Sequence, residues 1–307
     1  MDMSDNARMA GGLRGTLARE EPTAKHVSWR AGGLARLFYQ PADVPDLCEF
    51  LRGLDAGLPV LFIGLGSNLL VRDGGFPGAV VLTHRALGGI APEGGRDELA
   101  FRVGSGVPAP HLARHVARGG GAGAEWMAGV PGTVGGALAM NAGCYGGETW
   151  NHVATVETVD RAGVLRRHVP SDYEIGYRHA RLKSGADEWF VSAVFAFEPG
   201  DVAASMARIR GLLSKRIASQ PLNQPNAGSV FRNPQSDHAA RLIESCGLKG
   251  FAIGAAQVSP RHANFIVNLG GATARDIEAV IDHVHATVLA RTGVDLVREV
   301  RIVGEAA

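Results

Sequence analysis

The distribution of glycine is the sequence feature that most constrains this fold. The chain of 307 residues contains 42 glycines, which gather where short apolar runs end, in IGLGSNLL (63–70) and GGGAGAEWMAGVPGTVGGALAMNAGCYGGE (119–148). Glycine at a strand end lets backbone N–H groups approach a ligand closely and adopt positive φ. Large apolar residues interrupt the second run, whereas flexible linkers repeat Gly and Ser without such anchors. We therefore expect ligand-binding loops rather than linkers.

The familiar nucleotide-binding motifs do not account for these loops. The dinucleotide fingerprint G-x-G-x-x-G would continue from Gly64 and Gly66 to a third glycine at position 69, which is Leu69. A P-loop G-K-[ST], a hydrolase G-x-S-x-G elbow and a zinc-binding H-E-x-x-H sequence are also absent. This leaves open dinucleotide binding through a different fold.

Composition and charge exclude several classes of protein. With 46% hydrophobic residues the chain can bury a large core, and 31 basic against 30 acidic residues create no general field for nucleic acid or an anionic membrane. The cysteines Cys48, Cys144 and Cys246 match no disulfide framework or zinc spacing, so we expect no metal, a reducing cytoplasm, and a packing role for Cys144. No secretion signal or membrane helix is evident, and without heptads or an apolar strip we expect a monomer.

Hydrophobic periodicity predicts an α+β chain with two lobes. Strands are expected at the following ranges: 59–63, 78–83, 99–103, 153–160, 188–199, 263–268 and 294–304. Helices are expected at 108–120, 202–219, 238–250 and 273–293. The second lobe is predicted to start near Asp201, with helix 202–219 linking the lobes through the apolar stripe Met206, Ile209, Leu212, Leu213 and Ile217.

The stretch PNAGSVFRNP at 225–234 surrounds one serine with residues that form neither a helix nor a long strand. Pro225 and Pro234 bracket it, and Arg232 and Asn233 supply hydrogen-bond donors, which indicates a shaped loop that presents the hydroxyl of Ser229. The same composition is typical of an ordinary polar turn, so the pattern alone leaves both interpretations open.

Six stretches together carry a resemblance to a known family. They are GLGSNLLVRDGG, GAEWMAGVPGTVGGALAMNAGCYGGE, GYR, PNAGSVFRNP, AAQVSPRHANFIVN and REVRIVG, in this order. The chain from about Ala24 to Gly304 resembles the UDP-N-acetylenolpyruvoylglucosamine reductase family, in its shorter subtype. The resemblance implies a two-subdomain FAD-binding fold of the vanillyl-alcohol oxidase type, followed by a smaller α+β substrate domain. The expected boundaries are 1–23 for a loose tail, 24–200 for the FAD-binding domain and 201–307 for the substrate domain.

The resemblance also implies a reaction. Enzymes of this family use non-covalent FAD and NADPH to reduce an enolpyruvyl UDP-sugar to UDP-N-acetylmuramate, for peptidoglycan precursor synthesis. Hydride addition to an enol ether conjugated to a carboxylate builds up enolate charge, which a fixed donor must stabilise in the transition state. By family match Arg178 is that donor, Glu299 contributes to the enolate and its protonation, and Ser229 is the general acid.

Further residues are assigned by the same resemblance. The expected cofactor-binding residues are Gly64, Leu65, Gly66, Ser67, Asn68, Leu69, Gly129, Val130, Pro131, Gly132, Thr133, Gly135, Gly136, Asn141 and Gly143. The expected residues for the nucleotide-sugar substrate are Tyr177, Asn226, Lys249, Gln257, His262 and Asn264. Family members often have a serine two places after the catalytic arginine, whereas this chain has Ala180, so a hydrogen bond near Arg178 is missing or comes from His179.

Several alternatives stay open on the residue pattern alone. Arg178 could be a surface arginine, Glu299 a solvent-facing charge beside Arg298 and Arg301, and His262 the cap of a turn. Two other functions compete with the reductase. An oxidase of the same fold would lack the serine and glutamate motifs or attach its flavin covalently, and a flavin-binding or nucleotide-sugar-binding module would not need Ser229, Arg178 or Glu299.

Overall fold

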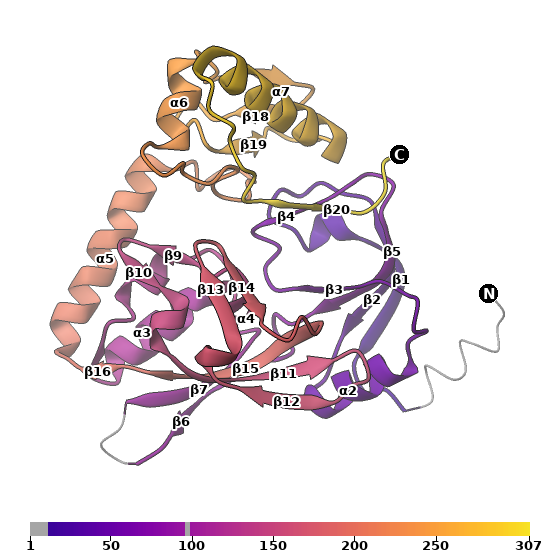
Figure 1. Ribbon diagram of the computed structural model, residues 1–307, viewed down its shortest axis with the longest axis vertical. Coiled ribbons are helices and arrows are strands. Elements are labelled where there is room, and N and C mark those ends of the chain that lie inside the picture. The colour runs from indigo at the N-terminus through magenta and orange to yellow at the C-terminus, as the bar shows by residue number, and fades with distance from the viewer. Residues whose placement is uncertain (1–11, 96–98) are drawn as a thin grey trace. The chain divides into compact units, whose positions relative to one another are not determined.

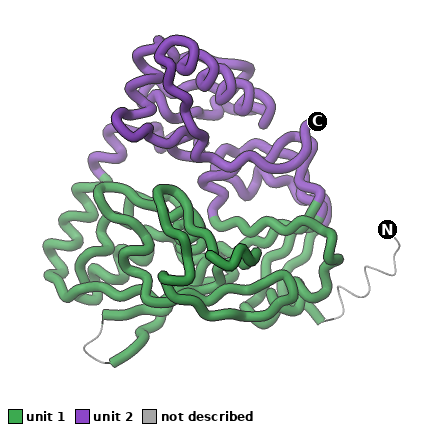
Figure 2. The backbone as a smooth tube through the Cα atoms, viewed as in Figure 1, with its two compact units in different colours: residues 1–18, 37–64, 78–213 green, residues 19–36, 65–77, 214–307 purple. Residues whose placement is uncertain are grey.

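The computed structural model describes residues 12–95 and 99–307 (Figure 1). The chain forms two compact units, which Figure 2 colours separately. Unit 1 contains residues 1–18, 37–64 and 78–213, and unit 2 contains residues 19–36, 65–77 and 214–307. Two early segments thus belong to the unit that holds the C-terminal third, while the domain boundaries expected from the resemblance stay a prediction.

Five antiparallel strands form the larger sheet of unit 1, in the order β12-β11-β15-β7-β6. They are β6 (Ile90–Glu93), β7 (Ala100–Gly104), β11 (Val153–Asp160), β12 (Leu165–His168) and β15 (Glu188–Ala196). The central strand β15 is buried from residue 191 to 195, which explains its nearly continuous apolar sequence. Helices α3 (Ala109–Arg118) and α4 (Val134–Ala139) contribute Leu112 and Leu138 to the same core as Phe195.

The strands of a second sheet follow the order β1-β2-β5-β3. They are β1 (Thr16–Pro22), β2 (Leu34–Gln40), β3 (Val60–Ile63) and β5 (Phe76–Leu82). Strands β3 and β5 pair in parallel, and helix α2 (Val44–Gly53) buries Leu47 and Phe50 in one cluster with Val81 of β5. Because β3 ends directly before Gly64, the first glycine loop leaves this sheet where a strand ends.

Unit 1 also contains several short elements, which lie between or after the strands of the larger sheet. They are β8 (Gly121–Ala122), η2 (Glu125–Gly129), β9 (Gly143–Cys144), β10 (Gly147–Glu148), η3 (Thr149–His152), η4 (Pro170–Asp172), β13 (Tyr173–Gly176), β14 (His179–Leu182) and β16 (Glu198–Pro199). Strands β13 and β14 form a hairpin in which Gly176 pairs with His179, so Tyr177 and Arg178 are its two-residue turn.

Unit 2 is built around one long helix. Its elements are η1 (Thr23–Lys25), β4 (Leu69–Val71), α6 (Ala239–Ser245), β17 (Ala252–Ile253), β18 (Ala256–Val258), β19 (Ile266–Asn268), α7 (Ala274–Thr292) and β20 (Arg301–Val303). Thr273 and Asp276 form the expected capping box of α7. The predicted apolar face is buried at Ile277, Val280, Ile281, Val284 and Val288. Strand β20 pairs in parallel with β4.

Two predictions about secondary structure need correction. The loose tail was expected to include residues 16–22, which form strand β1, while residues 1–11 lie outside the described part of the chain. The strand predicted at 294–304 is confined to β20, and Arg298 makes only an isolated bridge with Phe231. Alternating apolar residues in this segment therefore contact the core without continuing the ladder.

Helix α5 (Val202–Ser219) begins in unit 1 and ends in unit 2. Of its predicted apolar stripe, Ile209 is 2% exposed, whereas Ile217 is 61% exposed. Met206 and Leu213 pack at the edge of the unit 1 core beside Ile209. The stripe prediction is therefore wrong at the C-terminal end of the helix, because only the first part of the stripe meets an apolar surface.

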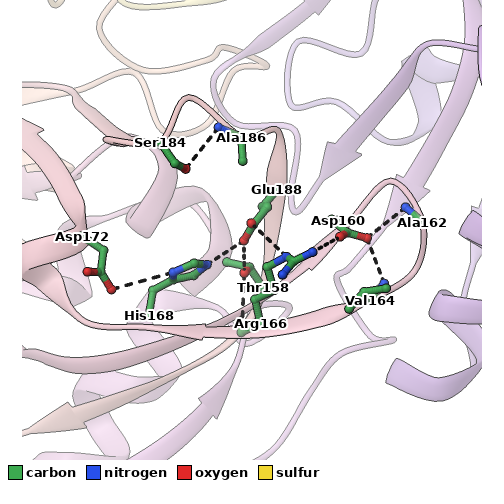
Figure 3. Close-up of polar contacts among 10 residues, drawn as sticks. All are labelled: Thr158, Asp160, Ala162, Val164, Arg166, His168, Asp172, Ser184, Ala186 and Glu188. Carbon is green, nitrogen blue, oxygen red and sulfur yellow. Dashed lines mark hydrogen bonds and ion pairs between the residues drawn. The ribbon is translucent and has the colours of Figure 1, made fainter.

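A polar network joins three strands of the larger sheet (Figure 3). The side chain of Glu188 on β15 is 4% exposed, and its carboxylate contacts Thr158, Arg166 and His168. Arg166 also contacts Asp160, whose other oxygen closes the β11–β12 turn. A buried carboxylate with several partners avoids the cost of an unpaired buried charge, so this network fixes the strands beside it.

The loop that follows β4 is fastened to the start of α7 by charged groups. Arg72 makes a two-pronged ion pair with Glu278, with N–O distances of 2.7 and 2.9 Å, and also donates to the carbonyl of Gly304. The carboxylate of Asp73 accepts the backbone N–H groups of Ala274 and Arg275 at 2.9 and 2.8 Å. The hydrogen bond from Arg72 is the main reason that the pKa of Glu278 lies below its usual value.

We expect Glu278→Gln to lower the free energy of unfolding by about 1 kcal/mol near pH 7. A depressed carboxyl pKa contributes stability above the unfolded-state pKa of about 4.3, and this contribution is lost as the pH falls through the folded-state pKa. The difference between wild type and Glu278→Gln should therefore shrink from about pH 5 downwards in urea unfolding followed by circular dichroism. Glu244→Gln, in an exposed pair with Lys249, is the matched control and should change little. An equal difference at all pH values would contradict this account.

Candidate active site

Backbone hydrogen bonds in unit 2 join the segments that carry Ser229 and Glu299. The N–H of Glu299 donates to the carbonyl of Val230 at 2.8 Å, and the N–H of Arg232 donates to the carbonyl of Val297 at 2.8 Å. Together with the bridge between Phe231 and Arg298, these bonds place the serine loop against the segment before β20. Two of the three predicted catalytic residues are thus held together by the main chain.

Two asparagines that are predicted to bind substrate shape this loop through their side-chain amides. Asn264 is 3% exposed, and its amide both accepts from the N–H and donates to the carbonyl of Phe231, at 2.9 and 2.8 Å. The oxygen of Asn226 accepts the N–H of Gly228, and its nitrogen donates to the carbonyls of Pro221 and Gln224. The shaped loop foreseen in the sequence is therefore fixed by its own amides.

The hydroxyl of Ser229 is not used in this arrangement. The residue is half-buried, and its Oγ makes no hydrogen bond to any described residue. A neutral serine hydroxyl carries one donor proton and can transfer it only to a strong base. The loop thus holds an uncommitted hydroxyl whose backbone position is fixed.

The glycine loop that starts after Gly64 reaches Glu299 within unit 2. The side-chain nitrogen of Asn68 donates to the carbonyl of Glu299 at 3.2 Å, and the N–H of Arg301 donates to the carbonyl of Asn68 at 3.1 Å. Gly66 has a φ of +58°, and its carbonyl accepts from the N–H of Ser28 at 3.1 Å. Ser28 lies in HVSWRAGG, a segment that contains none of the predicted site residues.

Three other predicted substrate residues lie in unit 2. Lys249 pairs with Glu244 at 2.7 Å, and the amide of Gln257 donates to the carbonyl of Gly250. The ring of His262 packs against Phe265, and its Nδ1 is buried without a hydrogen-bond partner among the described residues. Burial, assisted by the charge of Lys249, lowers the pKa of His262, which is therefore neutral at pH 7.

Arg178 stands at the turn of the β13–β14 hairpin in unit 1. Its φ of +60° is unusual for a residue other than glycine, and its Nη2 donates to the carbonyl of Gly143 at 3.0 Å. The guanidinium also lies 5.0 Å from the centre of the Tyr177 ring. A left-handed arginine persists only where its surroundings hold it, so this conformation indicates a functional position.

The substitution of Ala180 for a serine does not leave Arg178 without support. Ala180 pairs with Ile175 inside the hairpin, and the ring of His179 packs over Gly176. The carbonyl of Gly143 supplies a hydrogen-bond acceptor to the arginine. The second glycine loop therefore helps to orient the guanidinium.

The second glycine loop places an unpaired buried hydroxyl beside a glycine with space around it, which suits the binding of a flavin nucleotide. Thr133, which precedes α4, is 1% exposed, and its Oγ1 has no hydrogen-bond partner among the described residues. A methyl group on Gly64 would overlap the Thr133 side chain, whereas one on Gly136 would meet only that hydroxyl, 3.9 Å away. Internal packing therefore explains Gly64 but not Gly136, and a bound ligand would explain both Gly136 and the unpaired hydroxyl.

Other members of the predicted cofactor set have structural roles. Side chains at Gly129 and Gly135 would crowd Cys144 and Ser105 respectively, and Val130 belongs to the buried core. The N–H groups of Val134 and Gly135 at the start of α4 already bond to carbonyls of the β7–α3 connection. Cys144 donates to the carbonyl of Trp126, which agrees with its predicted packing role.

Two cavities of unit 1, of about 320 and 70 Å³, contain none of the predicted site residues. The larger one is lined by Trp126, Tyr145 and His152 among others. Within residues 12–95 and 99–307, no group of three His, Cys, Asp or Glu side chains is arranged to hold a metal ion. No helix in that part of the chain has both the length and the apolar character needed to cross a membrane.

Comparisons with known proteins identify two family domains in the chain. Residues 35–168 match an FAD binding domain, and residues 220–303 match the C-terminal domain of UDP-N-acetylenolpyruvoylglucosamine reductase. Reductases of that name from Nitrosospira multiformis and Thiobacillus denitrificans are each 55% identical, covering 100% and 97% of this chain and 94% and 96% of theirs. The crystal structure of the reductase from Thermus caldophilus is 29% identical over 95% of this chain and 99% of its own, with a TM-score of 0.79. The predicted α+β fold with an FAD-binding domain is confirmed.

We expect Thr133→Val to weaken FAD binding about tenfold, because a hydrogen bond to the cofactor is lost, without lowering the stability of the apoprotein. The matched control is Thr149→Val, since Thr149 is also fully buried but donates to the carbonyl of Ala142 at 2.7 Å. That control should lose about 1 kcal/mol of stability and keep its FAD affinity. Titration of each apoprotein with FAD and urea unfolding would measure both quantities. Unchanged FAD affinity in Thr133→Val would contradict the assignment.

Proposed function

The chain belongs to the UDP-N-acetylenolpyruvoylglucosamine reductase family, and we propose that it reduces UDP-N-acetylglucosamine enolpyruvate to UDP-N-acetylmuramate with NADPH. Members of this family are FAD-dependent oxidoreductases, and the matched FAD binding domain assigns that cofactor to this chain. The observation that carries the proposal is the backbone pairing that holds the predicted proton donor, Ser229, beside Glu299. We place the reaction in the cytoplasm and expect a monomeric enzyme.

The cofactor is assigned to the two glycine loops. Bound FAD would supply to the substrate the hydride that it takes from NADPH. In unit 1, Thr133 and the side-chain-free surface at Gly136 would contact the nucleotide. The segment from Leu65 to Leu69, in unit 2, stays a proposed cofactor-binding segment because of the family resemblance. Gly64 permits the close approach of the first loop to Thr133.

Ser229 is proposed as the general acid. Hydride addition at the β-carbon of the enolpyruvyl group leaves an enolate, whose α-carbon is basic enough to take a proton from a neutral hydroxyl. The loop delivers that hydroxyl to one face of one carbon, because Asn226 and Asn264 fix the backbone on both sides of it. General acid catalysis of this kind contributes about 10²- to 10⁴-fold to a rate.

Arg178 is proposed to stabilise the enolate. The negative charge that develops on the substrate carboxylate needs a fixed donor, and a planar guanidinium matches a carboxylate well. A carboxylate at Glu299 would repel the enolate, so it can help only as a proton donor or by orienting a donor. Tyr177, Lys249, Gln257 and His262 remain proposed contacts of the nucleotide sugar, while Asn226 and Asn264 act on the loop.

An anaerobic experiment on the purified protein tests the whole proposal. The flavin is reduced with NADPH, UDP-N-acetylglucosamine enolpyruvate is added, and the return of flavin absorbance is followed together with UDP-N-acetylmuramate. Rapid return with formation of that product is the expected result. Return only after admission of air would favour an oxidase, and failure to bind FAD would refute the flavin assignment.

We expect Ser229→Ala to slow reoxidation of the flavin by the enolpyruvyl substrate by about 10²-fold or more and to leave its reduction by NADPH unchanged. The two half-reactions are measured separately by anaerobic stopped-flow absorbance. Ser236→Ala, at an exposed serine of unit 2, is the matched control and should behave as wild type. Equal losses in both half-reactions would rule out a role in proton donation.

A further inference from the structure

We propose that Asn141 is a positioning residue for Arg178 rather than a ligand of the cofactor; this inference rests on the function proposed above. The resemblance placed Asn141 among the FAD-binding residues. In unit 1, however, its side chain connects the second glycine loop to the turn that carries the arginine.

The amide of Asn141 is fully committed to the protein as a donor. The residue is 2% exposed, and its Nδ2 donates to a carboxylate oxygen of Glu148 at 3.0 Å and to the carbonyl of Gly176 at 3.2 Å. Its Oδ1 accepts the backbone N–H of Trp150 at 3.2 Å. An amide nitrogen carries two protons, so none is left for a cofactor.

One partner of Asn141 belongs to the hairpin that carries Arg178. Gly176 is the last residue before the turn formed by Tyr177 and Arg178. The guanidinium of Arg178 donates to the carbonyl of Gly143, two residues after Asn141. The turn is therefore fastened to the 141–143 segment twice, once through its backbone and once through the arginine itself.

The backbone of both residues shows that this arrangement is imposed. Asn141 has a φ of +37° and Arg178 a φ of +60°. Asparagine enters the left-handed region at low cost, whereas arginine does so mainly where contacts compensate for it. Asn141 is thus well suited to the sharp bend that its own segment needs, and it supplies one contact that compensates at the turn.

The base of the hairpin is held by other means. Tyr173 packs against Trp150 and Phe190, with ring centres 4.6 and 5.8 Å apart, and its ring meets the edge of His168. His168 is in turn fixed by Glu188 (Figure 3). Loss of the Asn141 amide should therefore release the turn while the base of the hairpin stays folded.

A released turn would affect one half-reaction more than the other. Arg178 acts on charge that develops on the enolpyruvyl substrate, and a misplacement of about 1 Å can cost about 10²-fold in rate. Reduction of the flavin by NADPH involves no enolate. A change at Asn141 should therefore separate the two half-reactions, which a general loss of folding would not do.

The test replaces Asn141 with aspartate and with alanine. Asn141→Asp keeps the shape of the side chain but turns an acceptor oxygen towards the carboxylate of Glu148 and the carbonyl of Gly176. Asn141→Ala removes the same two hydrogen bonds without adding a charge, and it replaces the aspartate variant if that variant does not fold. We expect normal FAD content, flavin reduction by NADPH within about threefold of wild type, and reoxidation by the enolpyruvyl substrate slowed about 10²-fold. Asn151→Asp, the same change at an exposed asparagine of unit 1, should behave as wild type.

A double variant distinguishes failure of this inference from failure of the proposed function. If Asn141 acts through Arg178, Asn141→Ala should add little to the loss caused by Arg178→Ala in the oxidative half-reaction. If the rate losses of the two single variants multiply in the double variant, or if Asn141→Ala releases FAD, the positioning role is overturned while the proposed function stands. An unimpaired Arg178→Ala would instead refute the arginine's role in the reaction, and the inference with it.

Discussion

The parallel pairing of β4 with β20 is the interaction on which the proposed catalytic part of unit 2 depends. It continues directly into the hydrogen bonds that Asn68 makes with Glu299 and Arg301, so the first glycine loop and the glutamate occupy fixed positions relative to each other. The serine loop is then added to the other side of the same segment through Val230. One short ladder therefore organises a cofactor loop, a carboxylate and a hydroxyl.

Different positions of this chain need glycine for different physical reasons. Gly64 and Gly135 are required because neighbouring side chains fill the space that a Cβ would need, and Gly66 is required because its φ is positive. A Cβ on Gly136, in contrast, would meet only the Thr133 hydroxyl, 3.9 Å away. Some glycines of this chain are thus needed for internal packing, and others leave room for a ligand. The structure distinguishes these two roles because it shows which atoms surround each glycine.

Patterns within one segment predicted more of this fold than pairings between distant segments could, although the strand at 294–304 and the end of the α5 stripe were predicted wrongly. Helix α7 follows from its capping residues and its period, which are properties of one segment. The membership of 65–77 in unit 2 depends on pairing with residues far along the chain, and no local signal reports it. The side-chain amides of Asn141, Asn226 and Asn264 bond to the protein, a use that the sequence does not distinguish from ligand binding because an amide suits both equally.

The order of the strands along the chain has a consequence for folding. The side chain of Asn68 bonds to a residue 231 positions later, and Trp29 donates to the carbonyl of Ile266, 237 positions later. Contacts of such sequence separation require closure of a long loop before they contribute, which slows folding. During synthesis, therefore, Trp29 and Leu70 cannot reach the core that they share with Val284 and Val300 until the C-terminal third has been made.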